Sequence, residues 1–317
     1  MSGALYIGID LGGTNLRAGL VDEEGHIIGP VERAGTRAAE GPEAVMARMV
    51  ELARRLLERP EAAGRVRAVG VGAPGPLDSR RGLIIYTPNL PGFEDYPVAG
   101  RVAEATGLPT FLENDANCAC YGEFWVGAGR GVSDMVILTL GTGVGGGMVL
   151  DGRLRRGPHD TAGHLGHIVV RPGGRPCGCG GRGCLEQYAS ATAVLRRYRE
   201  LLAEAGATPP RDTGTRQVAE AAARGEPAAQ RAFREAAEAL GWALVTIANT
   251  IDPELAVIGG GLAGAGPLLL PPAEEILRRH ALYPPRERMR VEKALLGDDA
   301  GIIGAAGCAR TRYATSP

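Results

Sequence analysis

Aromatic residues are scarce in this sequence, and it contains neither a long apolar run nor a block of like charge. Phe, Trp and Tyr together make up 4% of the 317 residues. No apolar run approaches the roughly 18 residues that a membrane-spanning helix requires, and the first residues lack the basic and long apolar regions of a secretory leader. The net charge is −1 and no five consecutive residues carry charges of one sign, so no nucleic-acid or membrane surface is indicated. We therefore expect a soluble cytoplasmic protein that binds neither nucleic acid nor membrane.

Glycine, in contrast, is abundant, and part of it lies in an internal repeat. The sequence has 49 Gly residues, which indicates many tight turns. The segment IDLGGTNLRAGLV at 9–21 aligns without a gap with LTLGTGVGGGMVL at 138–150, and both are typical of a strand, a Gly/Thr turn and a second strand. Because 317 residues exceed what one core usually serves, we interpret the repeat as two similar domains whose turns face each other across a cleft. A chance likeness between two Gly-rich hairpins is the alternative.

The pattern of apolar residues predicts strands and helices along the whole chain. Short β-type runs predict strands at 5–10, 16–21, 26–34, 67–72, 109–113, 134–140, 147–150, 255–258 and 290–295. Helical patterns occur at 42–58, 97–106, 115–126, 185–204, 215–224, 227–251, 269–280 and 300–310. The segment 206–215 (GATPPRDTGT) is the best candidate for a flexible loop.

The two Gly/Thr turns are candidate phosphate sites. Consecutive N–H groups without neighbouring Cβ atoms form an anion-binding concavity, and Thr hydroxyls add donors. GTGVGG at 141–146 matches the spacing of a dinucleotide fingerprint, but a strand follows it where that fingerprint requires a helix. Asp10 precedes the first turn and suits a Mg²⁺ ion that bridges nucleotide phosphates. The candidate residues are Asp10, Gly12, Gly13, Thr14, Asn15, Gly141, Thr142 and Gly143, and two purely structural turns are the alternative.

VIGGG at 257–261 is a strand that runs into Gly259, Gly260 and Gly261. A backbone without side chains lets a flat ring lie against it, so we assign this stretch to the adenosine of a nucleotide. The alternative is an ordinary glycine-rich strand end.

The segment ENDAN at 113–117 ends a predicted strand and opens a predicted helix. Asn114 can cap that helix. Asp115 lies in its first turn, where the helix dipole favours an ionised carboxylate. Such a carboxylate can accept a proton from a substrate hydroxyl, although an ordinary Asn/Asp helix start is the alternative.

Three of the six Cys residues follow one another at C-x-C-x₄-C spacing. The spacing lets Cys177, Cys179 and Cys184 converge on one cation, and His167 lies ten residues before the first of them. One His and three Cys form a closed tetrahedral zinc set, which indicates a structural metal; free thiols are the alternative. The other three, Cys118, Cys120 and Cys308, lie on predicted helices and are expected in the core.

Taken together, these motifs resemble the ROK family of sugar kinases, and most closely its bacterial glucokinases. The resemblance covers nearly the whole chain and rests on DLGGTN, GAPGPL, PNLPG, ENDAN, LGTGVGGG, GHLGH, CGCGGRGCLEQYAS and VIGGG, in this order. It implies the actin-like, ribonuclease-H-like ATPase fold, in which two α/β domains flank a central cleft. The small domain would comprise residues 1–116 and the C-terminal helix at about 300–317, and the large domain residues 117–299 with the zinc loop.

The resemblance implies a hexose kinase that uses ATP, a catalytic Mg²⁺ and a structural Zn²⁺. Asp115 would be the general base that deprotonates the sugar 6-hydroxyl for in-line attack on the γ-phosphate, with glucose as the expected substrate. His167 would touch the sugar with one ring nitrogen and zinc with the other. The implied hexose ligands are Gly75, Asn89, Asn114, Asp115, His164, His167 and Glu186. Homodimers and homotetramers are common in the family, and we expect one of them here.

One position departs from the family's glucokinases. They usually read ExGH, whereas this sequence reads HLGH, with His164 in the place of the Glu. A neutral His offers one donor and one acceptor, and a carboxylate offers only acceptors, so the preferred hexose is open at this point. N-acetylmannosamine kinases of the family carry a His there, and N-acetylmannosamine or another hexose is therefore the alternative to glucose.

Two other classes of protein share parts of these motifs. A repressor of the family would carry a helix-turn-helix domain of roughly 80 residues before the DLGGT strand, and this sequence reaches that strand within four residues, so we do not expect a repressor. A non-kinase ATPase of the actin and chaperone class would not need ENDAN together with a zinc-shaped His/Glu loop. Polyphosphate remains open as a phosphoryl donor beside ATP.

Overall fold

The computed structural model describes residues 3–87, 90–208, 210 and 212–315, and these form two compact units. Unit 1 comprises the described residues of Met1–Gly131, Arg153–Gly163 and Leu295–Pro317, and unit 2 those of Val132–Gly152 and His164–Ala294. The chain passes between the units four times. Gly131, Gly152 and Gly163 each precede one of these passages, and each has a positive φ (89°, 69° and 87°), which Gly adopts without strain.

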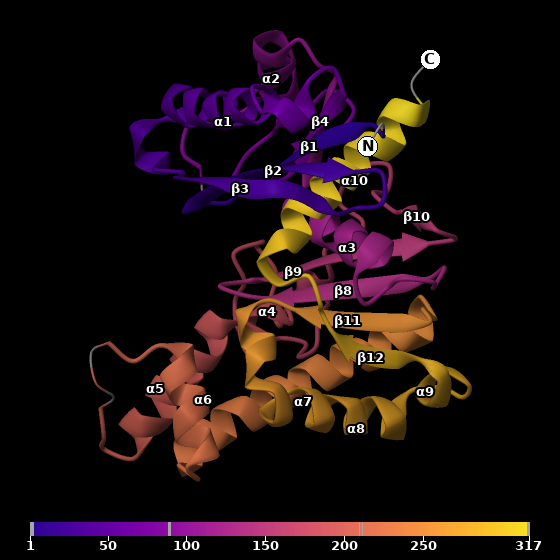
Figure 1. Cartoon of the computed structure of the whole chain (residues 1–317). Coiled ribbons are helices and arrows are strands. Elements are labelled where there is room, and N and C mark those ends of the chain that lie inside the picture. Colours follow the sequence, from indigo (N-terminus) through magenta and orange to yellow (C-terminus); the bar gives the residue numbers. More distant parts are fainter. Residues whose placement is uncertain (1–2, 88–89, 209, 211, 316–317) are drawn as a thin grey trace. The chain divides into compact units, whose positions relative to one another are not determined.

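The sheet of unit 1 has five strands in the order β3-β2-β1-β4-β7 (Figure 1). The first three are antiparallel neighbours, and β4 and β7 continue the sheet in parallel. The strand bounds are β1 Leu5–Leu11, β2 Asn15–Asp22, β3 Ile27–Gly35, β4 Val66–Ala73 and β7 Thr110–Asn114. A small separate hairpin is formed by β5 (Leu77–Asp78) and β6 (Leu83–Ile84).

Alternate residues of this sheet face two different helix layers, as the two-residue period of a strand requires. Leu5, Ile7 and Ile9 share one core with α1 (Pro42–Leu57) and α2 (Val98–Thr106). Tyr6 shares another with α10 (Ala300–Thr315), so α1 and α10 cover opposite faces (Figure 1).

Two glycines let α10 approach the sheet closely. A Cβ on Gly8 of β1 would collide with the Ile302 carbonyl oxygen, and one on Gly70 of β4 would collide with that of Ala305. The helix α3 (Asp115–Val126) packs on α10 as well. This packing places α3 in unit 1, so the boundary of the unit lies after Gly131 and not after residue 116, where the sequence predicted it.

The sheet of unit 2 has the strand order β9-β8-β11-β12, which repeats the order β2-β1-β4-β7 of unit 1. Its bounds are β8 Met135–Leu140, β9 Val144–Leu150, β11 Leu255–Gly259 and β12 Arg290–Lys293. The short strand β10 (Arg153–Leu154) belongs to the segment Arg153–Gly163 of unit 1. The internal repeat is thereby confirmed at the level of topology, with one correction. Leu11 pairs with Leu16, whereas Leu140 pairs with Val144. The second turn is one residue shorter, so the ungapped alignment fails for the second strand, which begins at Val144 and not at residue 147.

The helices of unit 2 cluster around the long helix α7, which runs side by side with α8 beneath β11 and β12 (Figure 1). Their bounds are α4 Glu186–Ala189, α5 Ala191–Glu204, α6 Thr215–Ala223, α7 Pro227–Thr250, α8 Leu270–His280 and α9 Pro285–Arg288. The single helix predicted at 185–204 is wrong. Ser190 is extended there, and its hydroxyl accepts a hydrogen bond from the Ala193 N–H at 3.0 Å, which begins a new helix.

Shorter features complete the fold. Short 3₁₀ segments occur at Ala38–Glu40, Pro60–Ala62, Leu165–His167, Gly261–Leu268 and Gly297–Asp299. Cys118, Cys120 and Cys308 are buried, as predicted.

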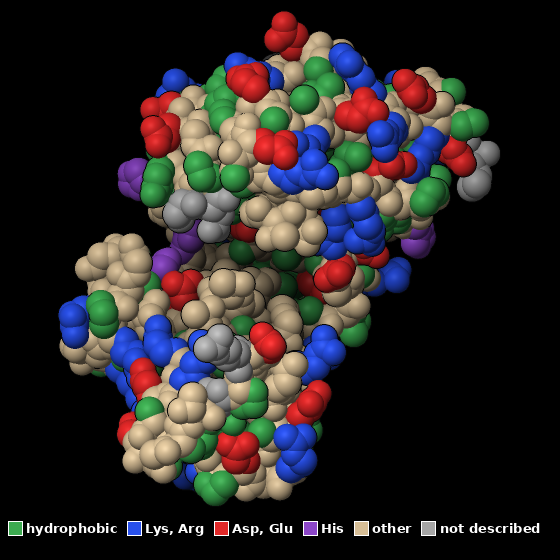
Figure 2. Space-filling view, turned by 90° about the vertical axis from the view of Figure 1, so that its left-hand side faces the viewer, with side chains coloured by type: hydrophobic (Ala, Val, Ile, Leu, Met, Phe, Trp, Pro, Cys, Tyr) green, Lys and Arg blue, Asp and Glu red, His purple; other side chains and the backbone are tan. Residues whose placement is uncertain are grey.

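Acidic and basic side chains are interspersed on the face drawn in Figure 2. Within the described ranges, no helix combines the length and the apolar character that crossing a membrane requires.

Because α10 lies so close to the sheet, one added methyl group at residue 8 should strongly lower the stability of the fold. Gly8→Ala should lower the free energy of unfolding by about 2–3 kcal/mol, because overpacking forces the helix away from the sheet. Gly100→Ala is the matched control, since a Cβ there meets no atom within 4 Å; in the exposed part of α2 it should raise that free energy by up to about 1 kcal/mol. Denaturant unfolding of both variants checks this, and equal midpoints would contradict it.

Candidate active site

A cavity of about 670 Å³ lies in unit 1 at the turn between β1 and β2. A hydrogen bond of 2.9 Å from the Gly12 N–H to the Asn15 carbonyl closes this turn. The lining residues include Asp10, Gly12, Gly13, Thr14, Asn15, Arg17, Arg33 and Asp298. The structure therefore brings the five candidate phosphate residues of the first turn together around one cavity.

Arg17 and Arg33 were missed by the sequence reasoning, although the hairpin register could have indicated them. Arg17 lies opposite Asp10 in the β1–β2 pairing and opposite Arg33 in the β2–β3 pairing. Directly opposed residues point to the same side of a sheet, so the three charged side chains form a row. Arg17 Nη2 donates to Asp10 Oδ2 at 2.5 Å, and the row adds cationic charge to a site rich in N–H donors.

Asp10 also lies against the first turn of α10. A Cβ on Gly301 would come within 2.9 Å of Asp10 Cγ. The positive end of a helix dipole favours negative charge at this place, and Arg17 adds a full positive charge. Both features suit a carboxylate at this position, and carboxylate oxygens are ligands that Mg²⁺ prefers.

The corner between β7 and α3 holds Asn114 and Asp115. Asn114 is the N-cap of α3, and its Oδ1 accepts hydrogen bonds from the N–H groups of Ala116 (3.0 Å) and Asn117 (3.2 Å), as the sequence predicted. Asp115 Oδ1 accepts one from the Ala116 N–H at 2.8 Å. Burial, and then the nearby Asp10 charge, raise the pKa of the Asp115 carboxyl above its usual range. A raised pKa makes this carboxylate a stronger base.

Glu113 and Arg156 form an ion pair directly beside this corner, and the sequence reasoning missed it. Arg156 Nε donates to Glu113 Oε2 at 2.5 Å. The two residues are separated by 43 positions and lie on a strand and a loop. No local pattern links such residues, so the sequence carries no signal for the pair.

A second cavity, of about 550 Å³, lies within unit 2 beside the turn between β8 and β9. Its lining includes Gly141, Thr142, Ala191, Thr215, Arg216, Phe233, Gly261 and Leu262. Two residues of the second phosphate turn and one glycine of VIGGG thus share a cavity with apolar and aromatic walls. Nothing in the sequence pattern indicated Thr215, Arg216 or Phe233, because each comes from a distant helix.

The other predicted glycines of unit 2 pack against protein atoms. A Cβ on Gly143 would collide with the Glu186 carboxylate, and one on Gly260 would collide with the Leu140 backbone. A Cβ on Gly259 would come within 3.2 Å of Ala294 Cβ. Of the three glycines that end VIGGG, only Gly261 is among the described residues that line the cavity.

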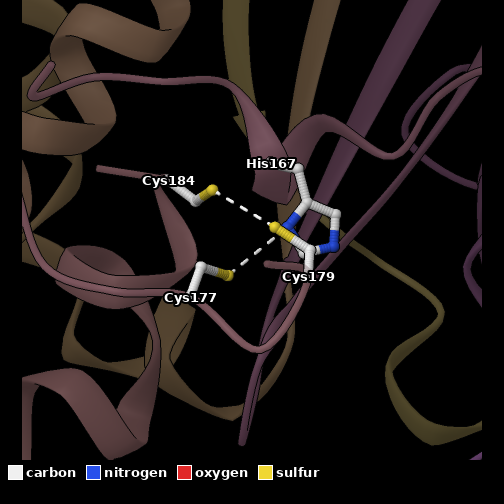
Figure 3. A group of neighbouring side chains, drawn as sticks. All are labelled: His167, Cys177, Cys179 and Cys184. Atoms are coloured by element: carbon white, nitrogen blue, oxygen red, sulfur yellow. Dashed lines mark hydrogen bonds between the residues drawn. The ribbon is translucent and has the colours of Figure 1, made fainter. Parts of the chain in front are cut away.

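His167, Cys177, Cys179 and Cys184 converge on one point (Figure 3), where one ligand atom from each lies within 4.8 Å of all the others. Cys179 Sγ lies 3.7 Å from Cys184 Sγ, and His167 Nδ1 lies 3.7 Å from Cys177 Sγ. Two thiolates on one tetrahedral ion with bonds of about 2.3 Å would be about 3.8 Å apart. The four residues can therefore hold a metal ion, and Nε2 is the His167 nitrogen that remains for another partner.

His164 and Glu186 lie near this cluster in unit 2. The His164 and His167 ring centroids are 6.4 Å apart. Partial burial, and then His167, lower the pKa of His164, which favours its neutral form. Glu186 Oε2 accepts a hydrogen bond from the Val144 N–H at 3.0 Å, at the start of β9. Gly166 lies so close to Val144 that a Cβ on residue 166 would collide with the Val144 carbonyl oxygen.

Of the remaining two candidate sugar ligands, Gly75 belongs to a loop of unit 1. Gly75 has a φ of 137°, and a Cβ there would come within 2.8 Å of the Tyr86 carbonyl oxygen, so the position favours Gly. Asn89 lies outside the described residues.

Comparison with known proteins identifies the family to which the chain belongs. The family model described as the ROK family matches residues 6–312. This protein belongs to the ROK family. A glucokinase from Thermotoga maritima is 38% identical to it over 96% of this chain and 97% of the relative.

Two solved ROK structures are similar over nearly their whole length. A ROK hexokinase from Thermus thermophilus has a TM-score of 0.84 and 36% identity, covering 98% of this chain and 100% of the other. A ROK glucokinase from Streptomyces griseus, in complex with glucose and AMPPNP, has a TM-score of 0.79 and 37% identity, covering 97% and 100%. The actin-like ATPase fold predicted from the resemblance is thereby confirmed.

Proposed function

We propose that this protein transfers the γ-phosphoryl group of ATP to the 6-hydroxyl of glucose. The observation that carries the proposal is the placement of two carboxylates within unit 1. Asp10 lies in the cavity of the first Gly/Thr turn, and it is close enough to Asp115 to help raise the pKa of that carboxyl. A base near an amide-rich turn with two Arg side chains beside it is an arrangement that suits phosphoryl transfer to a hydroxyl.

In this mechanism Asp115 accepts the proton of the sugar 6-hydroxyl, while the N–H groups of the first turn and Arg17 stabilise charge on the transferred group. Asp10 would hold Mg²⁺, which supplies charge neutralisation between the phosphates. Asn114 would donate to a sugar hydroxyl with one of the two N–H groups on Nδ2, while its Oδ1 serves the helix cap. The other proposed sugar ligands are Gly75, Asn89, His164, His167 and Glu186.

We propose ATP as the donor because of the unit 2 cavity. The amides at Gly141 and Thr142 suit phosphate, and the walls formed by Phe233 and Leu262 suit an aromatic base beside Gly261. Polyphosphate has no nucleobase that could fill such a cavity. We also expect a homodimer or homotetramer, on the family resemblance alone.

N-acetylmannosamine is the second candidate substrate, because His164 stands where glucokinases of the family usually have Glu. The identity to proteins named glucokinase supports glucose. A neutral His can still meet one sugar hydroxyl as a donor or an acceptor.

We predict that glucose gives the highest kcat/KM among glucose, N-acetylmannosamine, N-acetylglucosamine, mannose and fructose. ADP release should be measured with purified enzyme, Mg²⁺ and either ATP or polyphosphate. A preference for N-acetylmannosamine would identify His164 as the residue that sets specificity and would contradict glucose as the substrate. Equal rates with polyphosphate would contradict the assigned nucleotide cavity.

Asp115→Asn should lower kcat by about a thousandfold, within the range of losses seen for general bases, while glucose still binds. For the wild-type enzyme, kcat should fall as the pH decreases through the raised pKa of Asp115, because only the ionised carboxylate accepts a proton. The inflection should therefore lie above the pH at which an ordinary Asp titrates. Steady-state kinetics from acid to neutral pH test both points, and a variant with more than a tenth of the wild-type kcat would remove Asp115 from this role.

We propose that the His167, Cys177, Cys179 and Cys184 cluster holds a structural Zn²⁺, which orients His167 toward the sugar. The ligand set leaves no open position for substrate. The ion would hold together a loop rich in glycine that has few apolar side chains of its own.

Cys177→Ser should lower the zinc content below the expected value of about one ion per chain. It should also lower the melting temperature, since metal binding stabilises the folded loop. It should also raise the KM for glucose more than the KM for ATP. Cys120→Ala is the matched control, because Cys120 is buried outside the cluster; it should lower stability without loss of zinc. Elemental analysis and thermal unfolding check this. Full zinc content in Cys177→Ser would show that the ligand set is wrong.

A further inference from the structure

One buried carboxylate beside Asp115 has no part in the proposed mechanism. Glu113 precedes Asn114 at the end of β7 and is 3% exposed. Its Oε1 accepts hydrogen bonds from the Asn114 N–H at 3.1 Å and from Asn117 Nδ2 at 2.9 Å. Its Oε2 accepts the bond from Arg156 Nε at 2.5 Å. A buried carboxylate is strongly unfavourable without a compensating charge, and Arg156 supplies that charge.

Arg156 belongs to the segment 153–163, which is fastened to the rest of unit 1 at a second point. The Asp160 carboxylate accepts hydrogen bonds from the Ser79 N–H at 2.8 Å and from its Oγ at 3.0 Å. The Arg156 carbonyl accepts one from the Ala162 N–H at 3.0 Å, which closes the loop on itself. The guanidinium therefore approaches Glu113 from a fixed loop, and its side chain is 28% exposed.

The other two partners of Glu113 lie on either side of the strand-to-helix corner. Asn114 ends β7, and Asn117 stands in the first turn of α3. A carboxylate that binds both fixes the angle at which α3 leaves the sheet. Asp115 lies between them in the chain, so the position of its side chain depends on this corner.

We propose that Arg156 is a positioning residue for phosphoryl transfer, which acts on Asp115 through Glu113. The inference rests on the proposed role of Asp115 as the base. Without Arg156, Glu113 Oε2 loses its partner and the carboxylate can turn toward the space that the guanidinium leaves, which weakens its bonds to Asn114 and Asn117. Proton transfer requires a heavy-atom distance of about 2.6–3.2 Å, so a small shift of the corner slows the reaction although Arg156 touches no substrate.

The first test is Arg156→Met, which keeps an unbranched side chain as far as the position of Nε and removes the charge and the N–H donors. We expect kcat with glucose to fall about tenfold to a hundredfold, the loss that a misplacement of about 1 Å produces. The KM for ATP should change by less than about threefold, because the residues of the phosphate turns are untouched. The matched control is Arg59→Met, which removes a partly buried Arg from its ion pair with Glu32 in the same unit; its kcat should equal that of the wild type.

The second test is reciprocal rescue with Glu113→Gln. Alone, this change places an NH₂ group opposite the Arg156 N–H, two donors without an acceptor, and kcat should fall. In the double variant with Arg156→Met, the Gln oxygen still accepts the hydrogen bonds from Asn114 and Asn117. Water can then bind the Gln NH₂ group in the space that the Arg156 guanidinium left. The double variant should therefore recover to within about threefold of the wild-type kcat and exceed both single variants, a non-additivity expected only for coupled residues.

Circular dichroism and thermal unfolding ensure that only folded variants are compared. If Arg156→Met does not fold, Arg156→Lys replaces it, with an expected loss in kcat of about threefold to tenfold because Lys lacks the planar guanidinium. A folded single variant with wild-type kcat overturns the proposal, and so does a double variant no better than the single ones. If Asp115→Asn keeps its activity while Arg156→Met loses it, the assignment of the base fails and the coupling of Arg156 to Glu113 stands.

Discussion

The structure of unit 1 depends on the close packing of α10 against the sheet. The helix reaches the backbone of β1 and β4 because Gly8 and Gly70 have no side chains. Its first turn lies against the Asp10 carboxylate, and Arg312 near its end donates hydrogen bonds to the carbonyl oxygens of Leu112 and Ser79. One helix thus supports the cavity at the β1–β2 turn with its N-terminal end and the strand that carries Asn114 nearer its C-terminal end.

The two sheets share a strand order but differ in chemistry at their turns. Asp10 and Arg17 face each other in unit 1, whereas Thr139 and Gly145 occupy the equivalent paired positions in unit 2. Unit 1 therefore has a charged site, suited to Mg²⁺ and to the transferred group. The unit 2 turn has no such pair and instead adjoins a cavity with apolar walls. The repeated fold supplies two amide-rich turns. The side chains around them make one site charged and give the other apolar walls.

Much of the secondary structure could be predicted because it is encoded locally. The helix at 115–126 was predicted to the residue, since Asn114 is a strong cap, and the Cys spacing was sufficient to predict the cluster. Other features depend on residues far apart in the sequence, such as Glu113 with Arg156 or the helices that line the unit 2 cavity. The break at Ser190 was missed because apolar periodicity continues through it, while a single hydroxyl decides the new helix start.

The Cys-rich loop and the second Gly/Thr turn are held together through a few backbone groups. The Val144 N–H donates to Glu186, and Gly166 packs against the Val144 carbonyl. The Ala191 N–H donates to the Gly141 carbonyl at 2.8 Å, which fastens the start of α5 to the same turn. Glu186 lies between Cys184 and Ala191 in the chain, so the loop that carries the His167, Cys177, Cys179 and Cys184 cluster continues directly into these contacts. A change in the cluster is therefore transmitted to the β8–β9 turn as well as to His164 and His167, because the same short stretch of backbone supports both.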